Sequence, residues 1–300
     1  MKNIKRKAFL CAIFLTFLLT FLLTFLLTFF LLPASFSAAE AADGHSDSVQ
    51  QITQPAQVLR DGAERDWECS VAPPVSWLTV TDTILVGTDE RGEPIFRIVY
   101  PALQLTDDST SPLAKALDAW NAEIGTGAWH SKVRTYSKEA RANGYELLFA
   151  YTDITPITAW GRVDERIVSF FMEGNLYAGG AHPIPHVNAY TFDRESGRQI
   201  DLDEIVTGRE QLLAAIATAF KMQYPDAVAR DFPLGIMDAL QGQHPPEKGL
   251  SGFCWYIAAD GSLCIYYPSA VLASYAAGDF ALSITRTDAP ALFTSAYPTE

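Results

Sequence analysis

Cysteine is scarce in this chain, which has only four cysteines in 300 residues. Cys11 lies within an apolar run near the N-terminus, which leaves Cys69, Cys254 and Cys264. An odd number of cysteines in a chain of this length excludes a small fold held together by disulfides and permits at most one bridge. Cys254 and Cys264 flank a predicted hairpin turn at 260–261. The loop length would decide whether they share a face, so their redox state is left open.

The sequence also lacks the common catalytic motifs. It has no nucleophile elbow, no His-Glu-x-x-His, no glycine loop for phosphates and no EF-hand loop. We therefore predict no catalytic residue, no metal ligand and no cofactor. A cell-wall hydrolase or a deacetylase-associated protein stays as the alternative function, because glycoside hydrolysis needs only two carboxylates at a suitable separation.

Basic residues are outnumbered. Beyond residue 41 the chain carries 18 Lys+Arg against 34 Asp+Glu, a formal net charge of −16. Such a surface repels nucleic acid and anionic lipid, and it steers cationic partners toward itself. Acidic charge also keeps exported proteins soluble, so the charge alone does not identify a partner.

The N-terminal segment is built for export. Four basic residues in 1–7 precede 25 uncharged residues at 8–32, and small residues follow, with an A-x-A pattern at 39–41. The apolar run is long enough to remain as a membrane anchor, so both a cleaved signal peptide and a single transmembrane helix stay open for 1–41. We expect residues 42–66, which show no apolar periodicity, to be a flexible linker. Because only seven residues precede the run, we expect no cytoplasmic domain.

The remainder predicts an α+β fold with mixed or antiparallel sheets and a few packed helices, in one domain or two tightly joined halves. Ser111, Pro112 and apolar residues spaced by three and four predict a helix ending near 125. Further helices are predicted at 203–206, 209–224 and 226–240. A bend in the chain is predicted at 173–175. Alternation and turn residues predict strands at 77–86, 94–100, 145–152, 166–172, 186–192, 198–202, 253–258, 262–267 and 280–285.

The densest motif is Tyr177-Ala178-Gly179-Gly180-Ala181-His182-Pro183-Ile184-Pro185-His186. The paired glycines permit positive φ or a close backbone approach. His182 and His186 have the spacing of a helical metal site, but the two prolines exclude that helix. A structural role for His182 therefore outweighs ligand contact, and both outweigh metal binding or catalysis.

Two further groups of residues carry possible binding chemistry. Asp201, Asp203 and Glu204 could bind a cation, although acids are also typical of a helix N-terminus, which we favour. Aromatic residues gather in the C-terminal third, where alternation on strands would expose some of them. Exposed aromatics beside acidic groups would form a protein-binding surface. The residues concerned are Phe253, Trp255, Tyr256, Tyr266, Tyr267, Tyr275 and Phe280.

Over about 75–288 the chain resembles the RsiV-type C-terminal extracytoplasmic domain family, with a PdaC-type domain ahead of it. The resemblance rests on Tyr100-Pro101 before the helix containing Asn121, on Leu176 through His182, on Tyr190 to Asp193 with Gly197, and on Ile200 to Ile205. It closes with Tyr266-Tyr267-Pro268 and Leu272 to Gly278. It implies a PdaC-like half at 67–174 and an RsiV-like half at 175–300.

The resemblance implies a binding or sensor module of the bacterial envelope, exported or secreted. Family members include an anti-sigma factor that recognises lysozyme and a peptidoglycan deacetylase. This chain departs from both, with no expected segment for a sigma factor and no room after 288 for a catalytic domain. Expected partners are a cationic protein such as lysozyme or a cell-wall glycan, and the membrane if the leader is uncleaved. We expect ligand contacts at Tyr177, Gly179, Gly180, His182 and Asp193.

Overall fold

The computed structural model describes residues 48–57, 66–107, 109–126, 128–142, 151–179 and 182–296. All of them belong to one compact unit, Ser46–Glu300. The apolar run at 8–32 and the A-x-A pattern at 39–41 lie outside the described residues. Within the described ranges, no helix combines the length and the apolar character that a membrane crossing requires.

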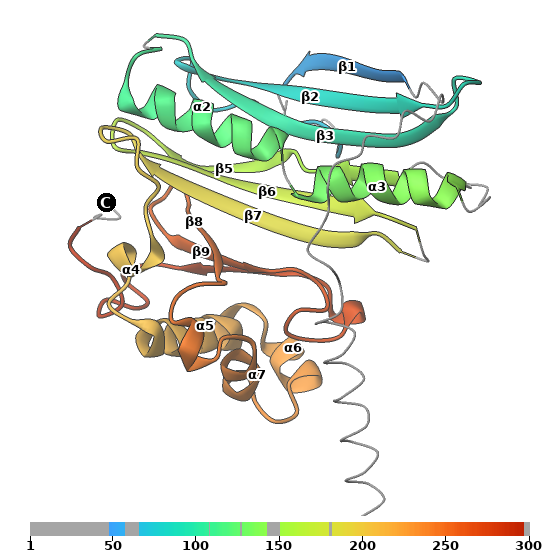
Figure 1. The fold of residues 1–300 in the computed structure, drawn as a ribbon. Helices are drawn as coiled ribbons and strands as arrows, with labels where there is room; N and C mark the ends of the chain where they lie inside the picture. The colour runs from blue at the N-terminus through green and yellow to red at the C-terminus, as the bar shows by residue number, and fades with distance from the viewer. Residues whose placement is uncertain are drawn as a thin grey trace, which may run out of the picture. The chain divides into compact units, whose positions relative to one another are not determined.

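A seven-stranded mixed sheet forms the larger part of the fold (Figure 1). Its order is β1-β2-β3-β4-β6-β5, and β7 pairs with the other edge of β6. Only β3 and β4 run parallel, and every other pair is antiparallel. The strands are β1 Ser48–Pro55, β2 Leu78–Thr88, β3 Pro94–Leu105, β4 Tyr151–Ile154, β5 Ile157–Val163, β6 Ile167–Tyr177 and β7 Ile184–Asp193.

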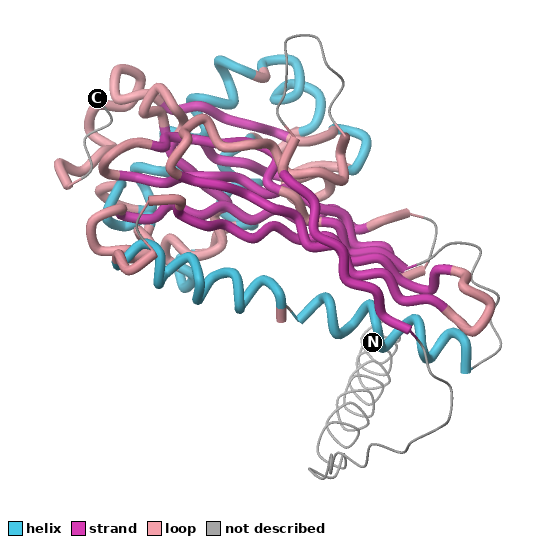
Figure 2. The backbone as a smooth tube through the Cα atoms, turned by 90° about the horizontal axis from the view of Figure 1, so that it is seen from above, coloured by secondary structure: helices cyan, strands magenta, loops and turns pink. Residues whose placement is uncertain are grey.

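Two helices, α2 (Pro112–Gly125) and α3 (Ala128–Ala142), lie along one face of this sheet (Figures 1 and 2). The N-cap of α2 is Ser111, whose hydroxyl accepts from the Ala114 N–H at 3.2 Å. The apolar stripe of α2 is buried, and the Trp120 ring meets the Phe170 ring of β6 edge-on at 5.3 Å. The predicted start, stop and buried face of this helix are confirmed.

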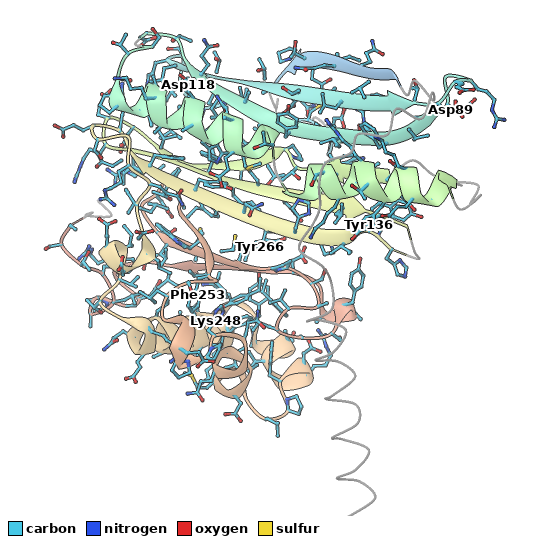
Figure 3. All side chains as sticks on the ribbon, in the orientation of Figure 1. Asp89, Asp118, Tyr136, Lys248, Phe253 and Tyr266 are labelled. Atoms are coloured by element: carbon cyan, nitrogen blue, oxygen red, sulfur yellow. The ribbon has the colours of Figure 1, made fainter. Side chains whose placement is uncertain are left out.

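A second sheet covers the opposite face of β6 and has the order β10-β9-β8. Its strands are β8 Cys254–Ile257, β9 Leu263–Tyr267 and β10 Phe280–Ile284. The Tyr266 ring lies between the two sheets, 4.7 Å from the Phe171 ring (Figure 3). The Ile257 N–H donates to the Ser169 hydroxyl at 3.1 Å, so the small sheet is bonded to the large one as well as packed on it.

Helices cover the outer face of the three-stranded sheet (Figure 1). They are α4 Leu202–Ile205, α5 Arg209–Gln223, α6 Pro225–Asp231 and α7 Ile236–Gln243, with short 3₁₀ turns η1 Pro246–Lys248 and η2 Tyr275–Ala277. Their apolar faces and the three-stranded sheet form the largest buried cluster. The predicted α+β class is confirmed, with two sheets between two helical layers.

Several predicted elements differ from the structure. The expected linker at 42–66 contains β1, which pairs antiparallel with Thr81–Thr88 of β2; its side chains are mostly polar because both faces are exposed there. Residues 173–175, where a bend was expected, lie inside the continuous strand β6. Glycine is needed at position 174 because the backbone of β4 approaches closely there: an added Cβ would lie 2.6 Å from the Ile154 carbonyl oxygen. The strand expected at 198–202 is reduced to one bridge at Gln199, since α4 begins at Leu202.

Other differences lie in the helices. The helix α3 escaped prediction because most of its side chains are polar, and its buried positions include Val133 and Ser137. The helix expected at 226–240 is divided into α6 and α7, and Gly235 with φ +100° begins the second. The expected boundary between 174 and 175 falls within β6, so the two expected halves share a strand.

Candidate functional site

The glycine corner connects β6 to β7. Gly179 has φ +87°, which a residue with a side chain rarely adopts. The ring of Tyr177 packs near the ring of Tyr151, with their centroids 6.4 Å apart. His182 is exposed, and its ring stacks near the exposed Tyr275 ring at 6.3 Å. Gly180, also expected to contact ligand, lies outside the described residues.

Asp193 lies at the opposite end of β7, nine residues from Ile184. At about 3.3 Å per residue, the strand separates it from the glycine corner by about 30 Å. Its carboxylate accepts from the Ser196 N–H at 2.8 Å and from the Ser196 hydroxyl at 2.7 Å, which holds the turn before Gly197. The five residues expected to contact ligand are therefore not brought into one site.

A buried polar cluster lies between these two ends, at His186. The Thr155 hydroxyl lies 2.8 Å from His186 Nε2 and 3.1 Å from a carboxylate oxygen of Asp153, which is itself buried. Burial lowers the pKa of His186, and the Asp153 carboxylate opposes that shift. Because Thr155 already occupies the nitrogen that faces Asp153, the arrangement is that of a structural network.

A groove of about 580 Å³, which we call the Trp255 groove, lies beside β7. Three segments line it: β7, the start of α4 with the residues before it, and the start of β8 with the residues before it. Its lining residues are Ala189, Gln199, Asp201, Leu202, Asp203, Leu250, Ser251, Gly252, Phe253 and Trp255.

The acidic wall of the Trp255 groove comes from the start of α4. Asp201 and Asp203 are exposed, and each places one carboxylate oxygen within 4.8 Å of the other and of Glu204. Glu204 is engaged, since Arg198 donates to its two oxygens at 2.6 and 2.7 Å and lowers its pKa. Glu204 Oε1 also accepts from the Asp201 N–H at 3.0 Å. The guanidinium already supplies a cation at Glu204, so Asp201 and Asp203 are the carboxylates that face the groove.

The aromatic wall is held by ring stacking and hydrogen bonds. The Phe253 ring, which Figure 3 labels, stacks on the His244 ring with centroids 3.7 Å apart. His244 Nε2 lies 3.1 Å from the Tyr267 hydroxyl, and its backbone carbonyl accepts from Arg209 at 3.1 Å. Trp255 is half-buried against the same cluster. The groove thus sets carboxylates beside aromatic surface, which suits the cationic head and apolar stem of Lys or Arg.

The cysteine thiols do not suit nucleophilic chemistry. Cys69, Cys254 and Cys264 are free thiols. Burial raises the pKa of Cys254 to about 12, and burial together with the neighbouring Asp66 raises that of Cys69 to about 11. Cys264 pairs opposite Tyr256, and Cys254 opposite Tyr266, so the two thiols share a face without facing one another. The thiols stay protonated near neutral pH.

The residues of both walls were singled out from the sequence, but their proximity in the folded structure was not predicted. The acidic turn at 201–204 and the aromatics Phe253 and Trp255 are visible as separate features, about 50 residues apart. Ala189 carries no chemical signal in the sequence, and its role is set by its place on an edge strand.

No family model matches the chain, and no curated protein matches it. The RsiV-type and PdaC-type resemblance therefore rests on the motifs quoted above. Among solved structures, the chain is similar to a DUF3298 family member from Bacteroides fragilis, at 14% identity over 84% of this chain and 94% of that one, with a TM-score of 0.45. It is also similar to a DUF3298 family protein from Pseudomonas aeruginosa, at 14% identity over 83% and 96%, with a TM-score of 0.41.

Proposed function

We propose that this chain is an extracytoplasmic binding module of the bacterial envelope that captures a cationic protein, with lysozyme as the first candidate. The observation that carries the proposal is the Trp255 groove, where Asp201 and Asp203 lie beside Trp255 and Phe253. A Lys or Arg side chain would lay its stem on the aromatic wall and direct its charge to the carboxylates.

Long-range charge supports the same partner class. The net charge of −16 beyond residue 41 attracts a basic protein over about a Debye length, or roughly 8 Å at physiological salt. Such attraction raises the association rate without selecting one partner, so selectivity must come from close contacts like those in the groove. The export segment at 1–41 would place the module where such a protein is met.

The test is calorimetry of the full chain in detergent against hen lysozyme, at low and at physiological salt. We expect saturable binding that persists at physiological salt and weakens about tenfold or more in the Asp201→Asn, Asp203→Asn double variant. Asn is as good an N-cap residue as Asp, so α4 should persist. The Trp255→Leu variant should weaken binding while retaining the charge.

The matched control is the Asp118→Asn, Glu123→Gln double variant on α2. It removes the same charge from exposed positions on the far side of the seven-stranded sheet (Figure 3). If both double variants weaken lysozyme binding equally, or if binding heat is measured only at low salt, the interaction is non-specific charge attraction. A parallel incubation with peptidoglycan tests the alternative, and released fragments would favour the cell-wall hydrolase.

A further inference from the structure

The outer edge of β7 is only partly paired. Along its inner edge, β7 pairs with β6 from Ile184 to Asp193. Along its outer edge the chain returns only briefly: the Asp193 N–H donates to the Arg198 carbonyl at 2.8 Å, and the Ile200 N–H to the Thr191 carbonyl at 2.8 Å. The segment 198–200 thus begins a further antiparallel strand, and it leaves the edge where α4 starts.

The part of this edge that the segment 198–200 leaves unpaired begins at Ala189. Backbone groups of alternate residues point to the same edge of a strand, so Val187 and Ala189 direct their N–H and C=O outward as Thr191 does. No residue in the described part of the chain hydrogen-bonds to these four groups. Pro185 occupies the next outward position and has no N–H, so the open edge is short.

The open edge borders the Trp255 groove. Ala189 lines the groove, and its side chain shares a face with that of its β6 partner Phe171, which packs toward the three-stranded sheet. In an antiparallel strand added to β7, the residue opposite Ala189 would point to the same face. Its side chain would therefore enter the groove beside Asp201 and Trp255.

We propose that the edge Val187–Ala189 receives an extended strand of the cationic partner, antiparallel to β7, with a Lys or Arg side chain of that strand in the Trp255 groove. This proposal rests on the proposed function and specifies how the partner is held. Main-chain hydrogen bonds would provide affinity, and the groove would select the basic residue. Among the described strands β1 also lies at an edge of the large sheet, but its residues Ser48–Pro55 include no charged side chain.

The geometry predicts which amides of the partner are used. Where Ala189 turns both backbone groups outward, the residue opposite must turn both of its own toward β7. The residue whose side chain enters the groove is thus also the residue whose N–H bonds to β7. The probes are two short peptides of alternating valine and lysine, one N-methylated at every lysine and the other at every valine. They share composition and charge.

We expect the valine-methylated peptide to bind the full chain at physiological salt and the lysine-methylated peptide to bind about tenfold or more weakly. Hydrogen exchange should slow at the Val187 and Ala189 amides with the valine-methylated peptide only. Equal affinities would mean that charge alone holds the peptides, and the reverse order would place lysine on the other face. Either result overturns the strand-addition proposal.

A variant pair tests the same edge in the protein. Val187→Pro removes an outward N–H that no described residue uses, whereas Val187→Thr keeps it. We expect only the proline variant to lose the valine-methylated peptide. If lysozyme binding requires Asp201 and Asp203 while both peptides bind alike, the binding module stands and strand addition falls. If lysozyme fails while the peptides differ, the edge proposal stands and lysozyme is the wrong partner.

Discussion

The side chain of Gln223 pairs with both backbone groups of Ser283. Its Nε2 donates to the Ser283 carbonyl oxygen at 2.7 Å, and its Oε1 accepts from the Ser283 N–H at 3.1 Å. The hydroxyl of Tyr224 does the same for Ala281, at 3.0 and 3.1 Å. The end of α5 therefore closes the edge of β10 with side chains, while the edge of β7 at Val187 and Ala189 has no such cover in the described structure.

Replacing Gln223 should destabilise the fold. Gln223→Ala removes both hydrogen bonds and leaves the edge groups of Ser283 to water, which should lower the free energy of unfolding by about 1–2 kcal/mol. Urea unfolding followed by circular dichroism measures this change. Lys221→Ala on the same turn of α5, at an exposed position, is the control and should change stability far less. Equal losses in both variants would show that the Gln223 contact contributes nothing.

The fold should lose stability in mild acid through His244. Burial first, then Arg209 and Lys248, lower the pKa of His244 from 6.5 to about 4, so the folded state keeps this ring neutral. Below pH 6.5 His244 becomes protonated in the unfolded chain but stays neutral in the folded chain. Stability is therefore complete above pH 6.5 and falls as the pH drops toward 4, by about 3 kcal/mol at most.

The test is urea unfolding across that pH range. His244→Gln should flatten the slope between pH 6.5 and 4.5, although the variant also loses the ring stacked on Phe253. His182→Gln makes the same substitution at an exposed position and is the control for the substitution itself. An unchanged slope in His244→Gln would refute the assignment. His186 has its pKa lowered by burial too, so some slope should remain.

The junction of the two sheets should not tolerate a side chain at Gly161. An added Cβ would lie 2.0 Å from the Ile257 carbonyl oxygen, which is backbone and cannot rotate away. Gly161→Ala should therefore cost about 2–3 kcal/mol of stability. The same substitution at Gly242 meets nothing within 4 Å on α7 and should stabilise by up to about 1 kcal/mol. Thermal melts of both variants check the opposite signs.

Asp193 should behave as a turn residue. Asp193→Ala removes the acceptor for the Ser196 N–H and hydroxyl, so the free energy of unfolding should fall by about 1 kcal/mol. Lysozyme affinity, measured by calorimetry, should stay within about twofold of the native value, because Asp193 does not line the Trp255 groove. Glu195→Ala in the same turn, at an exposed position, should change neither quantity. A selective loss of affinity in Asp193→Ala would restore the ligand role expected from the sequence.

Local chemistry made much of the fold predictable. Ser111 and Pro112 begin α2 where capping preferences place its start, and the apolar stripe of α5 is buried as its spacing predicts. The strands β8, β9 and β10 also fall where alternation placed them. The helix α3 and the edge strand β1 were missed, because their polar sequences are held by tertiary contacts instead of a strong apolar pattern of their own.

The candidate site depended on information that no local pattern contains. The sequence by itself determined the acidic balance, the α+β class, and the presence of an acidic turn and of strand aromatics, since these follow from composition and short spacings. Only the tertiary structure decided that Asp193 lies a strand length from His182 and that Asp201, Trp255 and Ala189 border one groove. Those placements depend on strand order and on the packing of one sheet against another. Both are long-range outcomes of burial, which spacing along the chain does not specify.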